Sequence, residues 1–225
     1  MDTAEVQTVA SAAERAYQHI KTGVMTRRYA PHDLLSEGQL ADAVGVSRTP
    51  IREALLRLQS EGLLRLLPKR GALVLPVTAD EERDVIETRR LVEQYAIRKA
   101  ITDSPGPALI ERLSGHVAAM RAAAKRHDTA GYVRADRDFH AEIVAASGNA
   151  ILVSLYQSLR ERQLRMGVVN LLDDSGSVID PARYRDTLAE HDQILQAIAG
   201  RSLRAAEAAV TRHLDHAEHR LARRA

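Results

Sequence analysis

The sequence contains no cysteine, which excludes disulfide bridges, thiolate metal sites and a cysteine nucleophile. Long hydrophobic runs are also missing, and no stretch approaches the ~18 apolar residues that a membrane-spanning helix needs. Residues Met1–Glu5 include an early acid and no apolar segment, so they do not resemble a signal peptide. We therefore expect a cytoplasmic protein with no membrane partner.

Aromatic residues are scarce, at 3% of the 225 residues, with no tryptophan and a single phenylalanine. Proteins that bind single-stranded nucleic acid stack its bases on aromatic side chains, so this composition argues against that class. The remaining composition, 45% hydrophobic and 28% charged, is that of a globular protein. The length allows two small domains, each with its own core.

A basic segment lies within a chain whose net charge is only +2. Residues 45–76 contain six basic and two acidic side chains, a local charge of +4. Such a segment indicates contact with a polyanion, although a solvated helix face would have the same composition. Because aromatic residues are few, a nucleic-acid partner would be a duplex.

Two short helices joined by a tight turn are predicted after a first helix over residues 8–25. Ser36 can cap the first of the two, with Gln39 three residues later in a capping-box arrangement. Gly45 favours the left-handed turn between them, and Ser47 can cap the second helix. Together they form a helix-turn-helix.

The exposed first turn of that second helix carries Arg48, Thr49 and Arg52. In a helix-turn-helix, these N-terminal residues face base edges in the major groove. Arginine pairs with guanine there, and threonine contacts a base or a phosphate. These three residues are therefore the candidate readers of double-stranded DNA.

Two short strands are predicted next, over residues 63–67 and 72–75. The turn between them carries Lys69 and Arg70. A hairpin after a helix-turn-helix is a wing, and a basic wing tip suits contact with the DNA backbone or minor groove.

This N-terminal segment resembles the DNA-binding domain of GntR-family regulators. The resemblance implies a winged helix-turn-helix over residues 8–76 whose DNA contacts include a phosphate held by Ser47. The resemblance rests on Leu35-Ser36-Glu37, Gly45-Val46-Ser47-Arg48-Thr49-Pro50-Ile51-Arg52 and Pro68-Lys69-Arg70-Gly71. The implied DNA-binding set is Ser36, Ser47, Arg48, Thr49, Arg52, Lys69 and Arg70.

Gly38 departs from the family pattern, in which many members carry an arginine after the Ser-Glu pair. One DNA contact is therefore missing. Glycine also weakens a helix by up to ~1 kcal/mol. We expect the DNA affinity or the half-site sequence to differ from the family pattern.

The rest of the chain, residues 78–222, predicts helices only, so the fold class is mainly α with an all-α C-terminal bundle. The polar segment 171–180 predicts a mobile loop. Six helices are expected, over residues 79–101, 107–126, 129–146, 150–170, 181–199 and 201–222.

Asp136, His140, His191 and His213 are candidate metal ligands. Asp136 and His140 are four residues apart and share one helix face, while the other two lie on the fifth and sixth predicted helices. Each alone is an ordinary helix residue, and an Asp–His pair at this spacing can simply stabilise a helix. If all four converge, they suit Zn²⁺, Ni²⁺ or Mn²⁺.

The C-terminal segment resembles the effector domain of the FadR branch of the family, the FCD domain. The motifs are Arg89-Arg90-Leu91-Val92-Glu93, Asp136-Arg137-Asp138-Phe139-His140, Ala146-Ser147-Gly148-Asn149, Glu190-His191 and His213. The resemblance implies an effector-binding and dimerisation domain in which those four residues bind a divalent metal, with zinc preferred. His216 and Asp138 are second choices. Six helices fit the VanR-like subgroup.

Two further residues are candidate effector contacts. Arg89 matches a pocket-facing arginine of the family and could pair with a carboxylate, or with Glu93 one turn away. Asn149 could bond an effector hydroxyl, or cap a helix. Carboxylates are the natural effectors for such a metal site, as small organic acids or sugar acids.

The sequence thus predicts a homodimeric transcriptional repressor that binds a near-palindromic, double-stranded operator and is released by a small carboxylate. One alternative is a metal-dependent enzyme in the helical domain. The chain lacks the His-Glu-x-x-His motif and the paired Glu-x-x-His repeats that would support it. The other alternative is a regulator whose metal is purely structural.

Overall fold

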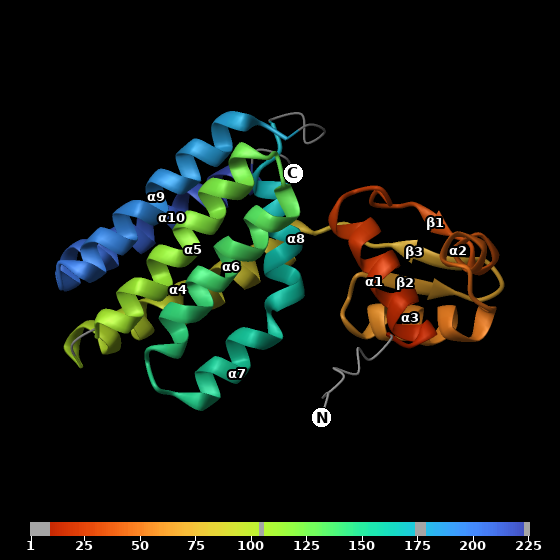
Figure 1. Cartoon of the computed structure of the whole chain (residues 1–225), viewed down its shortest axis with the longest axis horizontal. Helices are drawn as coiled ribbons and strands as arrows, with labels where there is room; N and C mark the ends of the chain where they lie inside the picture. The colour runs from red at the N-terminus through yellow and green to blue at the C-terminus, as the bar shows by residue number, and fades with distance from the viewer. Residues whose placement is uncertain (1–9, 104–105, 174–178, 223–225) are drawn as a thin grey trace, which may run out of the picture. The chain divides into compact units, whose positions relative to one another are not determined.

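In the computed structural model, the chain divides into two compact units, residues 1–76 and 77–225 (Figure 1). The structure describes residues 10–103, 106–173 and 179–222. Residues 8 and 9 of the first predicted helix and residues 174–178 of the predicted loop lie outside the described residues. Within the described residues, no helix has both the length and the apolar character needed to cross a bilayer.

The first unit is a winged helix-turn-helix, as predicted. Its sheet is antiparallel with strand order β1-β3-β2, and the β2–β3 hairpin forms the wing. The elements in chain order are α1 (Ala12–Met25), β1 (Leu34–Leu35), α2 (Glu37–Val44), α3 (Arg48–Ser60), β2 (Leu64–Leu67) and β3 (Gly71–Val74).

Strand β1 was not predicted, because a strand of two residues is too short to show an alternating pattern. It pairs with β3 through Leu34↔Leu73 and Leu35↔Ala72. Gly71 makes this pairing possible. Its φ is 105°, and a Cβ there would lie 2.2 Å from the carbonyl oxygen of Leu35. Glycine is therefore required where the wing meets β1.

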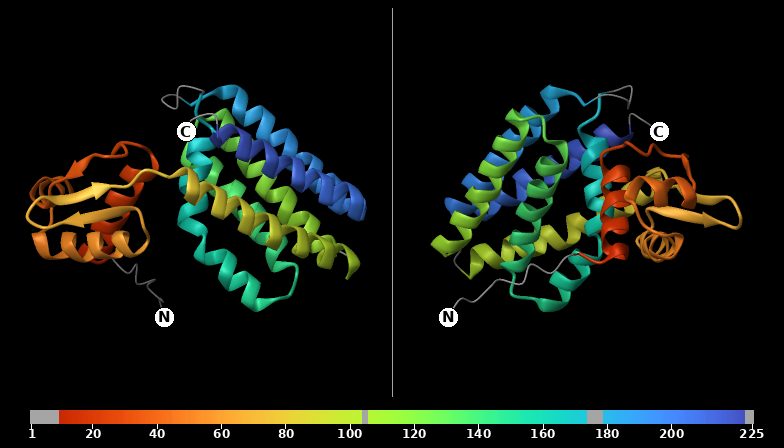
Figure 2. Two further views of the ribbon diagram at one scale, coloured as in Figure 1. Left: turned by 180° about the vertical axis from the view of Figure 1, so that it is seen from behind. Right: turned by 45° about the vertical axis from the view of Figure 1, so that its right-hand side comes forward.

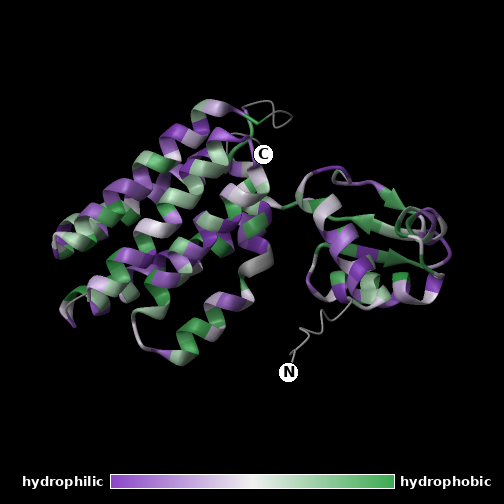
Figure 3. Ribbon diagram, in the orientation of Figure 1, coloured by the Kyte–Doolittle hydropathy of each residue, from purple (hydrophilic) through white to green (hydrophobic). Residues whose placement is uncertain are grey.

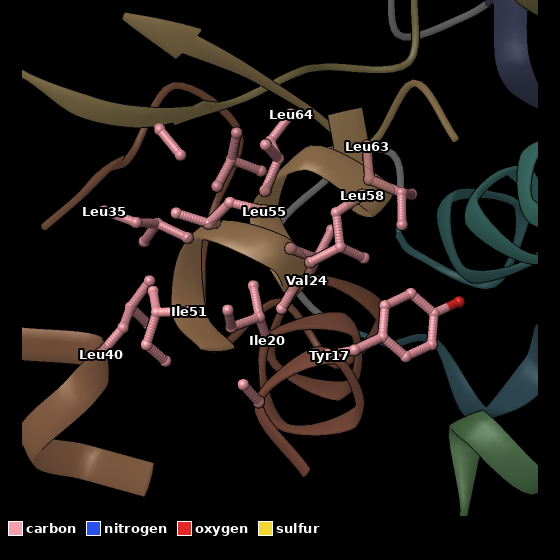
Figure 4. Close-up of a cluster of buried hydrophobic side chains, with 14 of the residues drawn as sticks. Tyr17, Ile20, Val24, Leu35, Leu40, Ile51, Leu55, Leu58, Leu63 and Leu64 are labelled. Atoms are coloured by element: carbon pink, nitrogen blue, oxygen red, sulfur yellow. The ribbon is translucent and has the colours of Figure 1, made fainter. Parts of the chain in front are cut away.

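The core of this unit lies between the helices and the sheet (Figure 4). In α3, the buried residues Ile51, Ala54, Leu55 and Leu58 recur at helical spacing, so this face packs inward. Full burial of a leucine side chain stabilises the fold by about 1.5–3 kcal/mol. The opposite face of α3, which includes Arg52, is left to solvent.

The second unit has seven helices among the described residues, where the sequence predicts six. The predicted helix over 150–170 is two helices that meet at Leu159. They are α4 (Ala79–Thr102), α5 (Pro107–Lys125), α6 (Thr129–Ala145), α7 (Ala150–Ser158), α8 (Arg160–Asn170), α9 (Pro181–Ala199) and α10 (Leu203–Ala222).

The break between α7 and α8 has a tertiary cause. Tyr156 is the buried residue of α7, whereas α8 buries a run of side chains that includes Gln163 and Met166. The two helices therefore pack differently, and the backbone N–H of Leu159 bonds to the carbonyl of Tyr156 instead of continuing one helix. No glycine or proline marks the break, so periodicity misses it. The assignment to the VanR-like subgroup rested on six helices and loses that support.

Helix α6 is the central element of this bundle. It packs against α4, α5, α7 and α8, while α10 packs against α4, α8 and α9. Figure 2 shows α7 at the edge of the bundle. Hydrophilic and hydrophobic residues alternate along the helices, as expected of amphipathic helices around a shared core (Figure 3). Side chains on the inner face of α6 therefore reach the interior.

The described ends of the segment 171–180 differ from the predicted polar, mobile loop, because they contain buried leucines and a β-bridge. Leu171 and Leu172 are both 2% exposed, and Leu172 forms a β-bridge with Ile179. The N–H of Asp180 donates to the carbonyl of Leu171, and the Asp180 carboxylate caps α9. The described ends of this segment are thus anchored to the bundle.

Candidate DNA-binding face and metal centre

The predicted DNA readers lie on the exposed start of α3. Arg48 and Thr49 occupy its first turn, and Arg52 follows one turn later; all three are exposed. The Arg52 Nε donates to Glu37 Oε2 of α2 at 2.8 Å. This ion pair is exposed and contributes little to stability, so it orients Arg52 without holding it firmly.

Ser36 and Ser47 occupy the N-cap positions of α2 and α3, as predicted, but neither side chain makes a capping hydrogen bond. The predicted capping box of Ser36 and Gln39 is therefore wrong. Their hydroxyl groups remain beside two helix N-termini whose backbone N–H groups attract anions. Both serines can therefore hold phosphates.

A groove connects the helix-turn-helix to the wing. Lys69 lies at the wing tip with φ of 60°, and Arg70 follows it; both are exposed. A side-chain Cβ at Gly38 would lie 3.7 Å from Arg48 Nη2, so the first turn of α2 faces the start of α3 across this groove. The residues that line it are Ser36, Glu37, Gly38, Arg48, Arg52, Leu66, Leu67, Pro68, Lys69, Arg70 and Gly71.

The four predicted metal ligands are brought together in the second unit. Asp136 and His140 come from α6, His191 from α9 and His213 from α10, and one ligand atom of each lies within 4.8 Å of the others. The three histidines are buried, whereas the side chain of Asp136 is 22% exposed.

Each of the three imidazoles presents its Nδ1 to an oxygen outside the cluster. His191 Nδ1 donates to the Thr187 carbonyl at 2.6 Å, and His213 Nδ1 donates to Glu190 Oε2 at 2.8 Å. His140 Nδ1 lies 2.9 Å from Glu93 Oε2, at an angle too oblique for a good hydrogen bond. A neutral imidazole that donates from Nδ1 to an outside oxygen keeps its lone pair on Nε2, as in the hydrogen bonds of His191 and His213.

The Nε2 atoms meet at the centre of the cluster. His140 Nε2 and His191 Nε2 are 3.1 Å apart, and His191 Nε2 is 3.1 Å from Asp136 Oδ1. Two nitrogens bound to one tetrahedral zinc at ~2.0–2.1 Å would be separated by roughly 3.3 Å. The donor set and its spacing therefore fit a divalent metal ion.

Two of the three histidines are held in the neutral form. Burial lowers the pKa of His213 to about 3 and lowers the pKa of His140. Burial alone would lower the pKa of His191 as well, but the Asp136 carboxylate outweighs it and raises that pKa. The imidazoles of His140 and His213 are therefore neutral near pH 7, which is the form that binds a metal.

A buried ion pair of Glu93 and Arg89 lies next to His140. Glu93 is fully buried and accepts hydrogen bonds from Arg89 Nε at 2.7 Å and from Tyr156 Oη at 2.6 Å. Burial alone would raise the pKa of Glu93, but the charge of Arg89, together with His140 and the hydrogen bond from Tyr156, lowers it. Glu93 is thus an ionised carboxylate beside His140, and the guanidinium of Arg89 balances its negative charge.

Glu190 is the carboxylate that contacts His213, as Glu93 contacts His140. Its Oε1 accepts from His216 Nδ1 at 2.8 Å and from Arg220 Nη1 at 3.2 Å. His216, the second-choice ligand, therefore contacts Glu190 and is not part of the cluster. Asp138, the other second choice, is exposed and pairs with Arg137.

A small, partly open cavity of about 30 Å³ adjoins the cluster. Asp136 and His213 line it, and so does Arg89, whose Nη2 is buried without a hydrogen-bond partner. Asn149 does not line it. Its Oδ1 instead accepts from the N–H groups of Ile151 and Leu152 and caps α7.

Gln163 also lines the cavity and was missed by the sequence analysis. Its side-chain nitrogen and oxygen are both buried without a partner. A glutamine in a helix is ordinarily exposed, so nothing in the sequence indicates this burial.

Comparison with known proteins identifies the family. A family model described as "Bacterial regulatory proteins, gntR family" matches residues 12–74, and one described as "FCD domain" matches residues 84–216. The chain belongs to the GntR family. Within this family, an uncharacterized HTH-type transcriptional regulator of Agrobacterium vitis is 34% identical over 140 residues, or 61% of this chain and 82% of that protein.

Two other GntR-family proteins extend the comparison. The gluconate operon transcriptional repressor of Bacillus subtilis (strain 168) is 26% identical over 151 residues, or 67% of this chain and 61% of that protein. A GntR transcriptional regulator from Rhodococcus sp. RHA1 has a similar solved structure, with a TM-score of 0.74 over 95% of this chain and 98% of that one. At 22% identity, this likeness supports the fold alone.

The GntR-family relatives are transcriptional regulators, and their fold is shared with this chain. The protein is therefore a transcriptional regulator rather than an enzyme. The interpretation of the His/Asp cluster as a catalytic centre is set aside.

Proposed function

We propose that this GntR-family regulator is a homodimeric repressor that leaves its operator when a small carboxylate binds next to a metal ion. The observation that carries the proposal is the cavity in the second unit. It is lined by two residues of the His/Asp cluster and by Arg89, whose Nη2 has no partner. Metal ligands and a guanidinium nitrogen with no hydrogen-bond partner in one cavity suit a carboxylate.

The first unit binds DNA through the groove between helix-turn-helix and wing. Arg48, Thr49 and Arg52 read base edges, Ser36 and Ser47 hold phosphates, and Lys69 and Arg70 contact the backbone or minor groove. In a two-fold symmetric dimer, the recognition helices enter successive major grooves about 34 Å apart. The operator is therefore a near-palindrome.

Asp136, His140, His191 and His213 would hold the metal. We favour zinc, with nickel or manganese as alternatives, because imidazole and carboxylate donors suit all three ions. When bound, the ion supplies positive charge and a coordination position for a carboxylate oxygen. Four protein donors fill a tetrahedral shell, so an effector would occupy a fifth or sixth position.

The effector carboxylate would also pair with Arg89 Nη2. The name of the Bacillus subtilis relative, a gluconate operon repressor, supports a sugar acid as one effector class. Other small organic acids share the same chemistry.

The test begins with DNA binding of the full chain, measured by fluorescence anisotropy at stated salt. A duplex from the chain's own promoter region is compared with a random duplex of equal length. We expect clear preference for the promoter duplex, and weaker binding when a metal-loaded sample receives D-gluconate or citrate. Equal binding to both duplexes would contradict an operator in this region.

A second set of measurements separates a sensing metal from a structural one. His213→Ala removes a proposed ligand, and His219→Ala is the matched control, because His219 is an exposed residue of α10 outside the cluster. We expect the first variant, but not the second, to lose both metal binding and effector response. If acids bind equally well with and without metal, the metal is structural only.

A further inference from the structure

We infer that Gln163 is a specificity-determining residue of the cavity, and that it selects an effector carrying a hydroxyl group as well as a carboxylate. This inference rests on the proposed carboxylate-binding function and adds a second recognition point on α8. It assigns the effector to the hydroxy acids, a narrower class than carboxylates in general.

The first observation is the state of the Gln163 side chain. It is 7% exposed, it lines the cavity, and both its Oε1 and its Nε2 are buried without a partner. Exchanging the two amide atoms would not change this, because neither position has a partner. Burying an amide without hydrogen bonds is unfavourable, so a ligand that satisfies it gains affinity.

The second observation is how α8 is held. Gly167 follows Gln163 by one turn on the same helix face. A Cβ at Gly167 would lie 2.6 Å from Val133 Cγ1 of α6, so the missing side chain lets α8 approach α6 closely. This close packing places α8, which carries Gln163, against α6, and both helices contribute residues to the cavity wall.

The chemistry of an amide then selects the ligand group. Gln163 offers one acceptor and one donor side by side. A hydroxyl group both donates and accepts, so it satisfies both atoms. A carboxylate accepts only, and its charge would face Oε1 unfavourably. We therefore assign the carboxylate to Arg89, whose guanidinium is paired with Glu93 through Nε but keeps Nη2 without a hydrogen bond, and the hydroxyl group to Gln163.

The experiment compares pairs of acids that differ in their hydroxyl groups. Metal-loaded full-length protein is titrated calorimetrically with citrate and tricarballylate, L-malate and succinate, and D-gluconate and hexanoate. We expect the hydroxy acid of at least one pair to bind about tenfold tighter or more, since its hydroxyl group satisfies a buried amide that the other member leaves unpaired.

Two variants test the residue itself. Gln163→Met keeps the length of the side chain without its polar atoms, and should abolish the preference while leaving affinity for the acid without hydroxyl unchanged. Its thermal midpoint without ligand should not fall, because no native hydrogen bond is lost. Met166→Leu, also in the cavity wall, is a volume-conserving control that should keep the preference.

The outcomes separate this inference from the proposed function. If acids bind but show no hydroxyl preference, or if Gln163→Met retains the preference, the role of Gln163 is wrong and the carboxylate function stands. If Gln163→Met lowers the thermal midpoint and weakens both acids equally, the amide is structural and the inference is overturned. If no acid in the panel binds, the carboxylate effector is wrong and the inference falls with it.

Discussion

Replacing Gly38 with arginine should strengthen DNA binding by adding a phosphate contact in each protomer. Gly38 lies in the first turn of α2, at the edge of the DNA-binding groove. A Cβ there would lie 3.7 Å from both Arg48 Nη2 and Ser36 Oγ, which is ordinary contact, so the side chain fits. Its guanidinium can extend along the groove toward a bound backbone.

The free-energy terms for the folded protein nearly cancel. Gly38→Arg recovers up to ~1 kcal/mol of helix propensity. A cation in the first turn opposes the helix dipole by about 0.3–1 kcal/mol, and repulsion from Arg48 adds a similar small cost. We therefore expect stability to change by no more than roughly 0.5 kcal/mol.

The effect on DNA binding should be larger. Each phosphate neutralised steepens the slope of log K against log salt by about 0.9, so a dimer gains about 1.8. At low salt, one charge-assisted bond of about 1.5 kcal/mol corresponds to roughly tenfold tighter binding, so the two bonds of a dimer correspond to roughly a hundredfold. The gain should be similar for operator and random duplexes, because a phosphate contact carries no sequence information.

Fluorescence anisotropy between about 50 and about 200 mM salt measures both quantities. Gly38→Ala is the matched control, because it restores helix propensity without adding a charge. We expect Gly38→Ala to keep the wild-type salt slope and Gly38→Arg to steepen it. Equal slopes for the two variants would show that the N-terminus of α2 does not face the DNA backbone.

Three other variants test the core, a helix cap and the metal centre. Leu55→Ala, at a fully buried position of α3, should destabilise the DNA-binding unit by about 2–5 kcal/mol in denaturant unfolding; a loss under ~1 kcal/mol would contradict its place in the core. Asn149→Ala should cost about 1 kcal/mol of stability without changing effector affinity, since its side chain caps α7; a selective loss of effector binding would restore it to the site. Glu190→Gln should weaken metal affinity about 10–100-fold in a competition titration, because Glu190 orients His213; unchanged affinity would refute that role.

Much of the first unit could be predicted because its signals are local. The Ser47–Arg52 stretch, Gly45 and the wing turn lie close together in sequence, and each has a conformational preference of its own. Strand β1 was missed because it depends on a distant partner: it exists because Gly71 allows close approach to Leu35. The capping box of Ser36 and Gln39 failed although its pattern is local.

In the second unit, helices and ligand types followed from the sequence, but several roles did not. The division at Leu159 arises because α7 and α8 pack differently, which periodicity does not encode. Asn149 left two roles open, and only its distance from the cavity decided between them. Gln163 gave no signal, because burial of a polar residue is a property of its neighbours.

The sequence by itself thus determined the winged helix-turn-helix, the helical second unit and the identity of four possible metal ligands. The helices and the Asp136–His140 pair follow from spacing along one helix or turn, where residues three or four apart necessarily share a face, whereas His191 and His213 joined the set through the family resemblance. The tertiary structure decided that His140, His191 and His213 converge, because they lie on three helices that meet only when the bundle core is packed. It also decided which imidazole nitrogen is free, since the oxygens that bind each Nδ1 belong to the folded surroundings.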